Sequence, residues 1–289
     1  NMMLGMRTGG KAILIPNPRD LPAVLKELSR HTFHSFPAVS TLFAGLANHP
    51  DFGTVNWRNL KVSVGGGMAV QSGTAKLWLE KTGCPICEGY GLSETSPSAS
   101  CNPTTSTEFT GTIGVPLPGT FMKLLDDEGQ DVTTPGMPGE IAIKGPQVMA
   151  GYWQRPDETA KVMTADGYFK SGDVGTIDEQ GYFKIVDRKK DMILVSGFNV
   201  YPNDVEETVS LCPGVLECAA VGVPDEKTGE AVKLVIVKKD PSLTEVVVRE
   251  YCKANMTGYK QPKIIEFKVE LPKTAVGKIL RRELRDAPK

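Results

Sequence analysis

Apolar and polar positions alternate along residues 1–110 in two different ways. Short apolar runs bounded by glycine, proline or charged residues predict strands, which we place at 12–15, 60–64 and 85–91. Longer amphipathic runs predict helices, which we place at 21–31, 38–49 and 69–83. Strands and helices that follow one another in turn are typical of an α/β protein whose helices pack on a parallel sheet.

Three helix ends carry local signals. Asp20 precedes a first turn that contains proline, so we expect it to cap the first of these helices. Gly83 is the expected end of the third helix. Farther along, Ser242 and Glu245 have the spacing of a capping box and predict the start of a helix over 242–256.

The pattern changes twice after residue 110. Residues 111–189 hold short strands separated by turn residues, with hairpin signals at 126–130 and 178–181, and we interpret them as a small β-barrel-like subdomain. Residues 190–289 alternate strands and helices again and form an expected α+β domain of about a hundred residues. We therefore predict a large domain made of 1–110 and 111–189, and a small mobile domain at 190–289.

Composition excludes some classes of protein. The chain has 289 residues, 40% of them hydrophobic, and a net charge of −1, so no overall basic field favours nucleic acid. No apolar run approaches the roughly 20 residues that a membrane span needs. Six scattered cysteines contain one C-x-x-C, at Cys84 and Cys87, which lacks a second metal-binding pair. We expect reduced, structural cysteines and a cytoplasmic protein.

One phosphate-binding signature can be set aside. The run GMRTGGKA (Gly5–Ala12) matches G-x-x-x-x-G-K, but Ala12 stands where a P-loop has a hydroxyl residue. No strand is predicted before the glycines, and a strand rather than a helix is predicted after them. The run therefore lacks the helix N-terminus that would face a phosphate.

Other candidate ligand-binding residues follow predicted strands. The segment SVGGGMA places Gly65 and Gly66 where a flat ligand can approach backbone, although a tight turn alone also explains them. In EGYGLSETS, Tyr90 offers a ring for stacking. Ser93 offers a hydroxyl, and Glu94 offers oxygen ligands for Mg²⁺. A solvated loop acid is the simpler interpretation of Glu94 taken alone.

The second half of the chain adds charged candidates. Asp173 lies in KSGDVGTID, where its carboxylate can accept both hydroxyls of a ribose or only complete a turn. Arg188 and Lys190 lie in DRKKD, which is either a polar linker or a hinge. Gly197 follows in a loop, and Lys278 lies in the loop PKTAVGK, framed by proline and glycine.

The order of these motifs is more informative than any one of them. YGLSE, SGD, DRKKD followed by SGFNVYP, and PKTAVGK follow one another as they do in adenylate-forming enzymes, the superfamily of acyl-CoA synthetases, luciferases and adenylation domains. The resemblance covers essentially the whole chain. It is closest to bacterial long-chain fatty-acid–CoA ligases, through runs such as KGPQVMAGYWQRPDET and LPKTAVGKILRRELRD.

The resemblance implies a ligase that uses ATP, Mg²⁺ and coenzyme A. Such an enzyme joins a fatty acid to AMP with release of pyrophosphate, and after rotation of its small domain coenzyme A displaces AMP to give the thioester. For the nucleotide, the resemblance implies that adenine is bound by Gly65, Gly66, Tyr90 and Gly91, that Ser93 contacts the α-phosphate, and that Glu94 ligates Mg²⁺. It implies that Asp173 binds the ribose and that Arg188 supports ribose and phosphate. It further implies a hinge at Lys190, a pantetheine tunnel lined by Gly197, and completion of the adenylation site by Lys278.

The resemblance also sets expectations for the surroundings of the enzyme. Nucleic acid is not an expected partner, whereas a homodimer and a peripheral contact with the inner face of the membrane are left open. Ser93 stands where many relatives have threonine, and it keeps the hydroxyl. The family's phosphate-gripping loop is absent from the sequence, so we expect the chain to be the C-terminal portion of a longer enzyme, inactive alone and binding ATP only weakly.

Two alternatives remain at this point. The chain could belong to an adenylation enzyme that activates another acid or loads a carrier protein, although no carrier segment follows Lys278. It could also be a nucleotide-binding module without catalysis. The presence of Glu94, Asp173, Arg188 and Lys278 argues against that loss.

Overall fold

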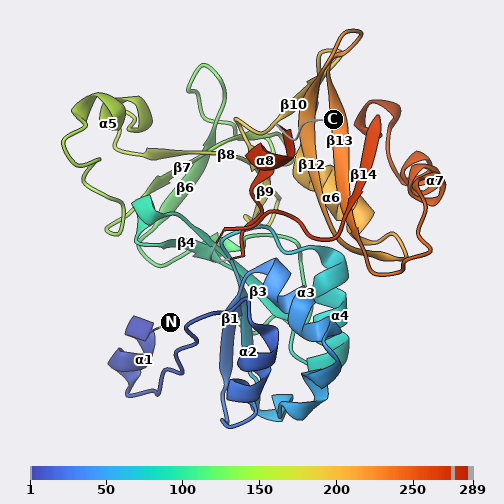
Figure 1. Cartoon of the computed structure of the whole chain (residues 1–289). Helices are drawn as coiled ribbons and strands as arrows, with labels where there is room; N and C mark the ends of the chain where they lie inside the picture. Colours follow the sequence, from blue (N-terminus) through green and yellow to red (C-terminus); the bar gives the residue numbers. More distant parts are fainter. Residues whose placement is uncertain (1, 275–276, 286–289) are drawn as a thin grey trace.

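The structure is a computed structural model that describes residues 2–274 and 277–285, with side chains from Gly5 onward. Three sheets build the described part, and Figure 1 shows them as three clusters that meet at the centre of the molecule. A short helix, α1 (Met2–Thr8), precedes them.

The first sheet joins parallel and antiparallel strands. Its order is β1-β2-β3-β4-β5, with β1, β2 and β3 parallel and the last two strands antiparallel. The strands are β1 (Ser35–Ala38), β2 (Val62–Gly65), β3 (Ile86–Gly91), β4 (Ser98–Cys101) and β5 (Val115–Pro116). The helices are α2 (Leu21–Leu28), α3 (Ser40–Asn48) and α4 (Ser72–Thr82), with single turns η1 (Pro50–Thr54), η2 (Trp57–Asn59) and η3 (Ser93–Thr95). The predicted α/β arrangement is confirmed.

Both predicted helix ends in this region are confirmed. Asp20 Oδ1 accepts a hydrogen bond from Ala23 N at 3.1 Å, which satisfies a free donor in the first turn of α2. Gly83 ends α4 with φ +69°, the left-handed conformation that glycine adopts without steric cost.

Two strand assignments in this region were wrong. Residues 12–15 form no strand, because no neighbouring strand pairs with this apolar run. The strand Ser35–Ala38 was missed, since Pro37 in so short a run argues against a strand. Proline is tolerated here because β1 lies at the edge of the sheet, where β2 is its one partner among the described residues. The structure agrees with rejecting a P-loop, since α1 contains Gly5 and ends just before Gly9 and Gly10, and no helix directly follows these glycines.

The second sheet is the predicted β-rich subdomain. Its antiparallel order is β6-β7-β8-β9, and the described residues contain no pairing that closes it into a barrel. The elements are β6 (Phe121–Leu125), β7 (Gly139–Lys144), α5 (Pro156–Val162), β8 (Phe169–Ile177) and β9 (Phe183–Arg188). The predicted hairpin at 178–181 joins β8 to β9.

The third sheet belongs to the C-terminal region. Its order is β11-β10-β13-β12, and β14 pairs in parallel with β13. The strands are β10 (Ile193–Val195), β11 (Phe198–Val200), β12 (Val215–Asp225), β13 (Gly229–Lys238) and β14 (Ile264–Lys268). The helices are α6 (Pro202–Ser210), α7 (Glu245–Asn255) and α8 (Arg281–Arg285), with one further turn, η4 (Gly258–Lys260). The division at residue 190 stays a prediction.

The predicted capping box of α7 was wrong. The helix begins after Thr244, whose Oγ1 accepts a hydrogen bond from Val247 N at 3.4 Å. Ser242 instead donates to Asp240 in the preceding turn. Both residues are good caps, and the tertiary position of the turn decides between them.

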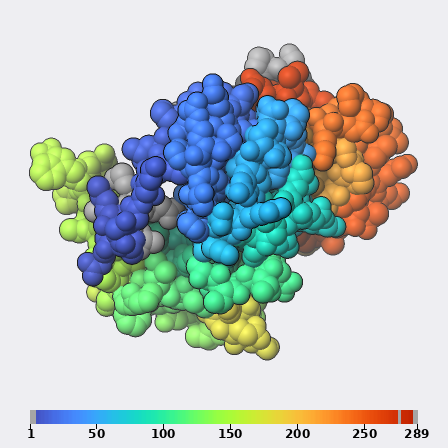
Figure 2. Space-filling model, turned by 90° about the horizontal axis from the view of Figure 1, so that it is seen from below, coloured from blue at the N-terminus to red at the C-terminus, as the bar shows by residue number. Residues whose placement is uncertain are grey.

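Separate cores hold the sheets. Aromatic rings fill the core between the first sheet and its helices, where the fully buried Trp78 lies 4.7 Å from Phe43 and donates from Nε1 to Ser63 Oγ at 2.9 Å. In the C-terminal region, α6 and α7 contribute Val205, Val209 and Val248 to one core. Leu284 of α8 belongs to a second core, which also contains residues of β12 and β13. Figure 2 shows residues in light blue to teal directly against the orange C-terminal residues, and α4 is in contact with α6.

The cysteines are all free, and five of the six are buried. Burial raises the pKa of the Cys252 thiol to about 11. The pKa moves in the same direction, for the same reason, in Cys87, Cys101, Cys212 and Cys218. Protonated, buried thiols fit the predicted structural role. Within the described residues, no helix has the length and apolar character needed to cross a bilayer.

Candidate active site

The glycine turn after β2 packs closely against the neighbouring strand. A Cβ at Gly65 would lie 2.5 Å from Val70 Cγ2, and one at Gly66 would lie 3.1 Å from Gly89 O. Glycine is therefore required for the turn to fold back onto β3.

Tyr90, Asp173 and Arg188 come together from three strands. The hydroxyl of Tyr90, on β3, donates to Asp173 Oδ2 at 2.7 Å. Asp173 on β8 lies directly opposite Arg188 on β9, and Arg188 Nε is 3.4 Å from Asp173 Oδ1. Burial raises the pKa of Asp173, while Tyr90 and Arg188 oppose that rise. A buried carboxylate held from both sides is a ready acceptor for further hydroxyl groups.

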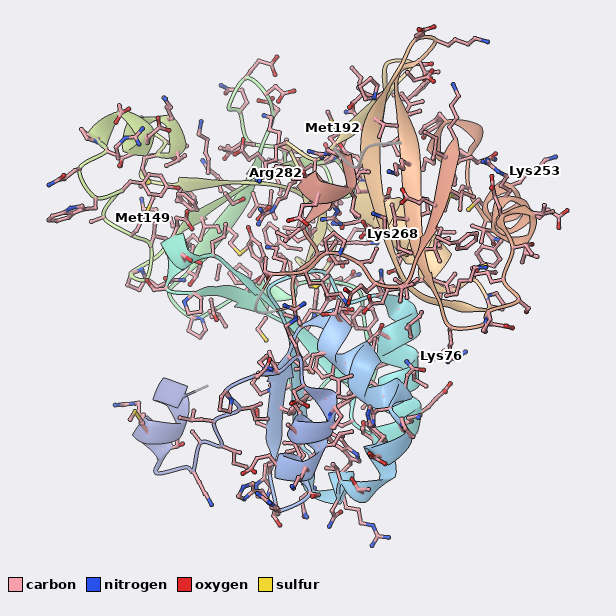
Figure 3. All side chains as sticks on the ribbon, viewed as in Figure 1. Lys76, Met149, Met192, Lys253, Lys268 and Arg282 are labelled. Carbon is pink, nitrogen blue, oxygen red and sulfur yellow. The ribbon has the colours of Figure 1, made fainter. Side chains whose placement is uncertain are left out.

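The chain turns sharply after Tyr90. A Cβ at Gly91 would lie 1.7 Å from Pro97 O, so no other residue fits there. The turn leads into η3, which presents Ser93 at the surface and Glu94 half-buried. Tyr152 donates its hydroxyl to Glu94 Oε1 at 2.9 Å. Met149 N donates to Glu94 O at 2.8 Å (Figure 3).

Glu94 is a single carboxylate, and the described residues contain no group of three acidic, histidine or cysteine side chains that could hold a metal. One of its two oxygens is engaged by Tyr152. A hard cation such as Mg²⁺ commonly uses one or two carboxylates together with substrate phosphates and water. The arrangement therefore fits a cation that is shared with a bound phosphate group.

Lys278 reaches the same region from the C-terminal end. Its loop is a hairpin in which Lys273 bridges to Ile279 and Lys278 N donates to Thr274 Oγ1 at 3.1 Å. Lys273 anchors the base of the hairpin through Glu217 Oε2 at 2.7 Å. The segment before α8 runs between the first sheet and the third (Figure 1). Residues 275–276 of this loop lie outside the described residues.

The charge of Lys278 acts on the Asp173–Arg188 pair. Burial lowers the pKa of Lys278, and the positive charge of Arg188 lowers it further, while Asp173 acts in the opposite direction. The charge of Lys278 in turn favours the ionised form of Asp173. Two cations and one carboxylate thus share a partly desolvated region, which suits an anionic ligand.

Two predicted residues lie outside this group. Lys190 is exposed in the turn after β9, although its charge still acts on Asp173. Gly197 occupies the exposed turn between β10 and β11, with φ +83° and no atom within 4 Å of the position that a Cβ would take. The structure therefore brings together Tyr90, Asp173 and Arg188 with Lys278, and it leaves Gly197 apart from them.

Two nearby residues were missed by the sequence reasoning. Tyr152, which holds Glu94, lies within GYWQRPDET, where an aromatic residue gives no separate signal. Glu88 precedes Tyr90 and accepts a hydrogen bond from Val70 N at 2.9 Å. Burial raises the pKa of Glu88 to about 7. The only sequence signal that could have identified Glu88 is an acidic residue within a strand that was predicted to be buried.

Known proteins resemble this chain in sequence and arrangement. The model of the AMP-binding enzyme family matches residues 1–153, and that of the AMP-binding enzyme C-terminal domain matches residues 204–278. A long-chain-fatty-acid–CoA ligase of Escherichia coli O6:H1 is 52% identical over 286 residues, which cover 99% of this chain and 51% of the relative. The chain therefore spans about half the length of the curated relatives it matches.

Solved structures give the same result. ATP-bound MatB from Rhodopseudomonas palustris matches with a TM-score of 0.88 and 31% identity, over 98% of this chain and 56% of that one. The anthranilate CoA ligase AuaEII in complex with anthranoyl-AMP matches with a TM-score of 0.89 and 31% identity, over 96% of this chain and 55% of that one. The chain belongs to the family of AMP-binding enzymes, within the adenylate-forming superfamily that its ordered motifs resemble.

Proposed function

We propose that the protein carrying this chain is an AMP-forming long-chain fatty-acid–CoA ligase. In the first half-reaction a carboxylate oxygen of the fatty acid attacks the α-phosphorus of ATP, and pyrophosphate leaves. In the second, the thiol of coenzyme A attacks the acyl carbonyl, and AMP leaves with the electron pair of the broken C–O bond. The 52% identity to a long-chain-fatty-acid–CoA ligase favours this substrate class.

The observation that carries the proposal is that the charges of Lys278, Arg188 and Asp173 act on one another, although these residues come from separate segments of the chain. The attack of a carboxylate on ATP brings two anions together, so a cation at that point offsets the developing charge. Lysine suits this role because its charge sits on a flexible stem. Lys278 would then act in the first half-reaction, with Arg188 beside it on ribose and phosphate.

The nucleoside would lie on the opposite side of this group. A flat adenine ring would lie along the backbone of Gly65, Gly66 and Gly91, where the fold packs the chain tightly, and Tyr90 would provide a ring for stacking. The carboxylate of Asp173 would accept the ribose hydroxyls while Tyr90 and Arg188 keep it oriented. Each contact uses a group that the fold already holds in place.

Phosphate and metal binding would involve η3. Ser93 is exposed and offers its hydroxyl to the α-phosphate. Glu94 would hold Mg²⁺, which when bound neutralises charge on the phosphates. Tyr152 fixes one carboxylate oxygen of Glu94 and so orients the other.

The second half-reaction would require a different placement of the C-terminal region. Gly197 is too exposed to act on a bound adenylate in the present arrangement. We propose that rotation about Lys190, in the exposed turn after β9, brings Gly197 to the site for pantetheine to pass. The rotation would withdraw Lys278 at the same time.

A thioester assay with the full-length protein tests the proposal. Long-chain fatty acid, Mg·ATP and coenzyme A should give acyl-CoA, AMP and pyrophosphate, each in equal amounts. Adenylate formation without transfer to coenzyme A would favour the alternative of a carrier-loading enzyme. No pyrophosphate release with any acid would favour a nucleotide-binding module without catalysis. Peripheral membrane contact and a homodimer stay predictions of the resemblance.

A further inference from the structure

Two helix caps join the C-terminal region to the part of the chain before it, one with α4 and one with β9. The N-cap position of α4 is Gln71, whose side chain makes no capping hydrogen bond. One free backbone donor is satisfied instead by Glu207 of α6, which accepts from Ser72 N at 3.3 Å and also from the Ser72 hydroxyl. A carboxylate at a helix N-terminus is favoured by both hydrogen bonding and the helix dipole.

The reverse contact occurs at the start of α6. Its N-cap position, Tyr201, likewise provides no side-chain hydrogen bond. Asp187 of β9 accepts from Asn203 N at 2.9 Å, and Asp187 is only 1% exposed. Glu207 of the C-terminal region thus caps α4, and Asp187, which precedes that region, caps α6.

The seam between α4 and α6 is closely packed. A Cβ at Gly73, in the first turn of α4, would lie 2.8 Å from Ser210 O at the end of α6. Real Cβ atoms essentially never approach so closely, and the obstacle is backbone. The two helices can meet at this distance only because position 73 is glycine.

The seam determines where Lys278 lies. α6 is joined to the segment after Lys278 through Arg281, whose Nη2 donates to Glu206 Oε2 at 2.8 Å. Arg281 is half-buried and also donates to Asn203 Oδ1 at 3.0 Å. Any shift of α6 relative to α4 would therefore move the base of the Lys278 loop.

We propose that Glu207 is a positioning residue for the first half-reaction: by capping α4 it holds the C-terminal region in the orientation that places Lys278 beside Arg188. This inference rests on the proposed function. Glu207 acts only through Lys278. Its loss should slow formation of the acyl-adenylate and spare the transfer of a supplied adenylate to coenzyme A, which needs the seam to open.

Glu207→Ala in the full-length protein is the first test. Alanine is a good helix residue, so α6 should still form. Fatty-acid-dependent ATP–pyrophosphate exchange should fall about tenfold, the effect expected for losing one charge-assisted hydrogen bond. Thioester formation from synthetic oleoyl-adenylate should be unchanged or faster. Glu250→Ala is the matched control, because it removes an exposed acid of α7 far from the seam, and it should leave both rates unchanged.

Gly73→Ala tests the seam without touching an acid. Alanine raises helix propensity within α4, so the helix itself should still form, and thermal denaturation shows whether the fold tolerates the added methyl group. The added methyl group should nevertheless push α6 away and lower pyrophosphate exchange, again with the second half-reaction spared. A variant that is stable, impaired in exchange and normal in thioester formation would support the proposal.

Other outcomes would overturn it. Equal loss of both half-reactions in Glu207→Ala, or pyrophosphate exchange at the wild-type rate in that variant, would remove Glu207 from this role. Small-angle X-ray scattering of the 289-residue chain tests the seam between α4 and α6 independently of activity. A larger radius of gyration than that of the wild type is expected for both variants. Scattering curves identical to the wild-type curve would contradict the proposed role of the seam. A wild-type protein that forms no adenylate would refute the proposed function instead. Scattering would still show whether Glu207 and Gly73 maintain the contact between α4 and α6.

Discussion

The C-terminal region presents two loops that differ sharply in their surroundings. The Lys278 loop is packed between elements: Gly277 is buried, its carbonyl accepts from the Thr41 hydroxyl at 2.9 Å, and a Cβ there would lie 3.5 Å from Val39 Cγ2. The turn at Gly197 projects into open space, and Phe198 beside it is 56% exposed. One loop is docked and the other is not.

The difference indicates which step this arrangement serves. Under the proposed function, the docked Lys278 would offset the charge that develops near Asp173 and Arg188 as an adenylate forms. An open glycine turn with an exposed aromatic residue beside it has the properties of a surface that binds in another arrangement. The two loops belong to one sheet and its connections, so rigid rotation would exchange them. Substitutions in each loop can separate the two roles.

The largest effect is expected for Lys278→Ala in the full-length protein. Removing a cation from the point where charge develops should slow adenylate formation by roughly 10²–10³-fold, the range found for loss of a single transition-state donor. Thioester formation from supplied oleoyl-adenylate should stay within a few-fold of wild type. The two rates are measured by pyrophosphate exchange and by release of AMP.

Lys253→Ala provides the matched control for this change. Lys253 is exposed on α7, away from the candidate site (Figure 3). Its loss should leave both half-reactions unchanged. If Lys278→Ala lowered both to the same degree, a folding defect would be the explanation and the docked loop would lose its assigned role.

Gly197→Leu should have the opposite profile. Leucine in the exposed turn should block the path of pantetheine and slow thioester formation by about 10²-fold, the scale of effect that a small misplacement in a reacting site produces, while adenylate formation persists. Because φ at Gly197 is +83°, the substitution also strains the backbone. Gly181→Leu introduces the same strain in another open turn, with φ +86° and no atom within 4 Å of its Cβ position. Thioester formation that falls equally in both variants would assign the loss to strain.

Sequence patterns predicted most of the fold and proposed the members of the candidate site, for physical reasons. Asp20 and Gly83 act within one turn of their helices, so their signals are local and were recognised. Tyr90, Asp173 and Lys278 were found because they lie in ordered family motifs. Their assembly from three elements could not be derived from spacing alone.

Contacts between distant segments were not accessible to the sequence. Glu207 and Ser72 are separated by 135 positions, and neither belongs to a recognisable motif. The apolar run at 12–15 has the composition of a strand, yet it lacks a partner, which only the assembled sheet decides. Patterns within one segment predict its conformation, whereas pairing depends on the whole molecule.

Glu88 offers a test of the packing between β3 and the turn after β2. Burial raises the pKa of Glu88 to about 7, with the negative charge of Glu207 adding to the rise. The folded state therefore keeps a proton that the unfolded chain releases near pH 4.5, and stability falls as pH rises through this window to about 7. Glu88→Gln removes this penalty and keeps an oxygen for Val70 N.

The free energy of unfolding, from urea titrations at pH 5 and pH 8, measures the effect. The advantage of Glu88→Gln over wild type should grow by about 2 kcal/mol between the two pH values. A constant difference would show that Glu88 titrates normally. In Glu207→Ala the window should move to lower pH, because the like charge facing Glu88 is gone.

The smallest effect is expected for Thr41→Val, which probes the docked loop from the other side. Valine keeps the shape of threonine and loses only the hydroxyl that donates to Gly277 O. Loss of one neutral hydrogen bond of about 1 kcal/mol should slow adenylate formation by roughly fivefold. Thioester formation from supplied adenylate should not change, since the Lys278 loop is then withdrawn. A variant with both rates at the wild-type level would mean that the loop is held without Thr41. A variant with only the thioester step reduced would contradict the assignment of this arrangement to the first half-reaction.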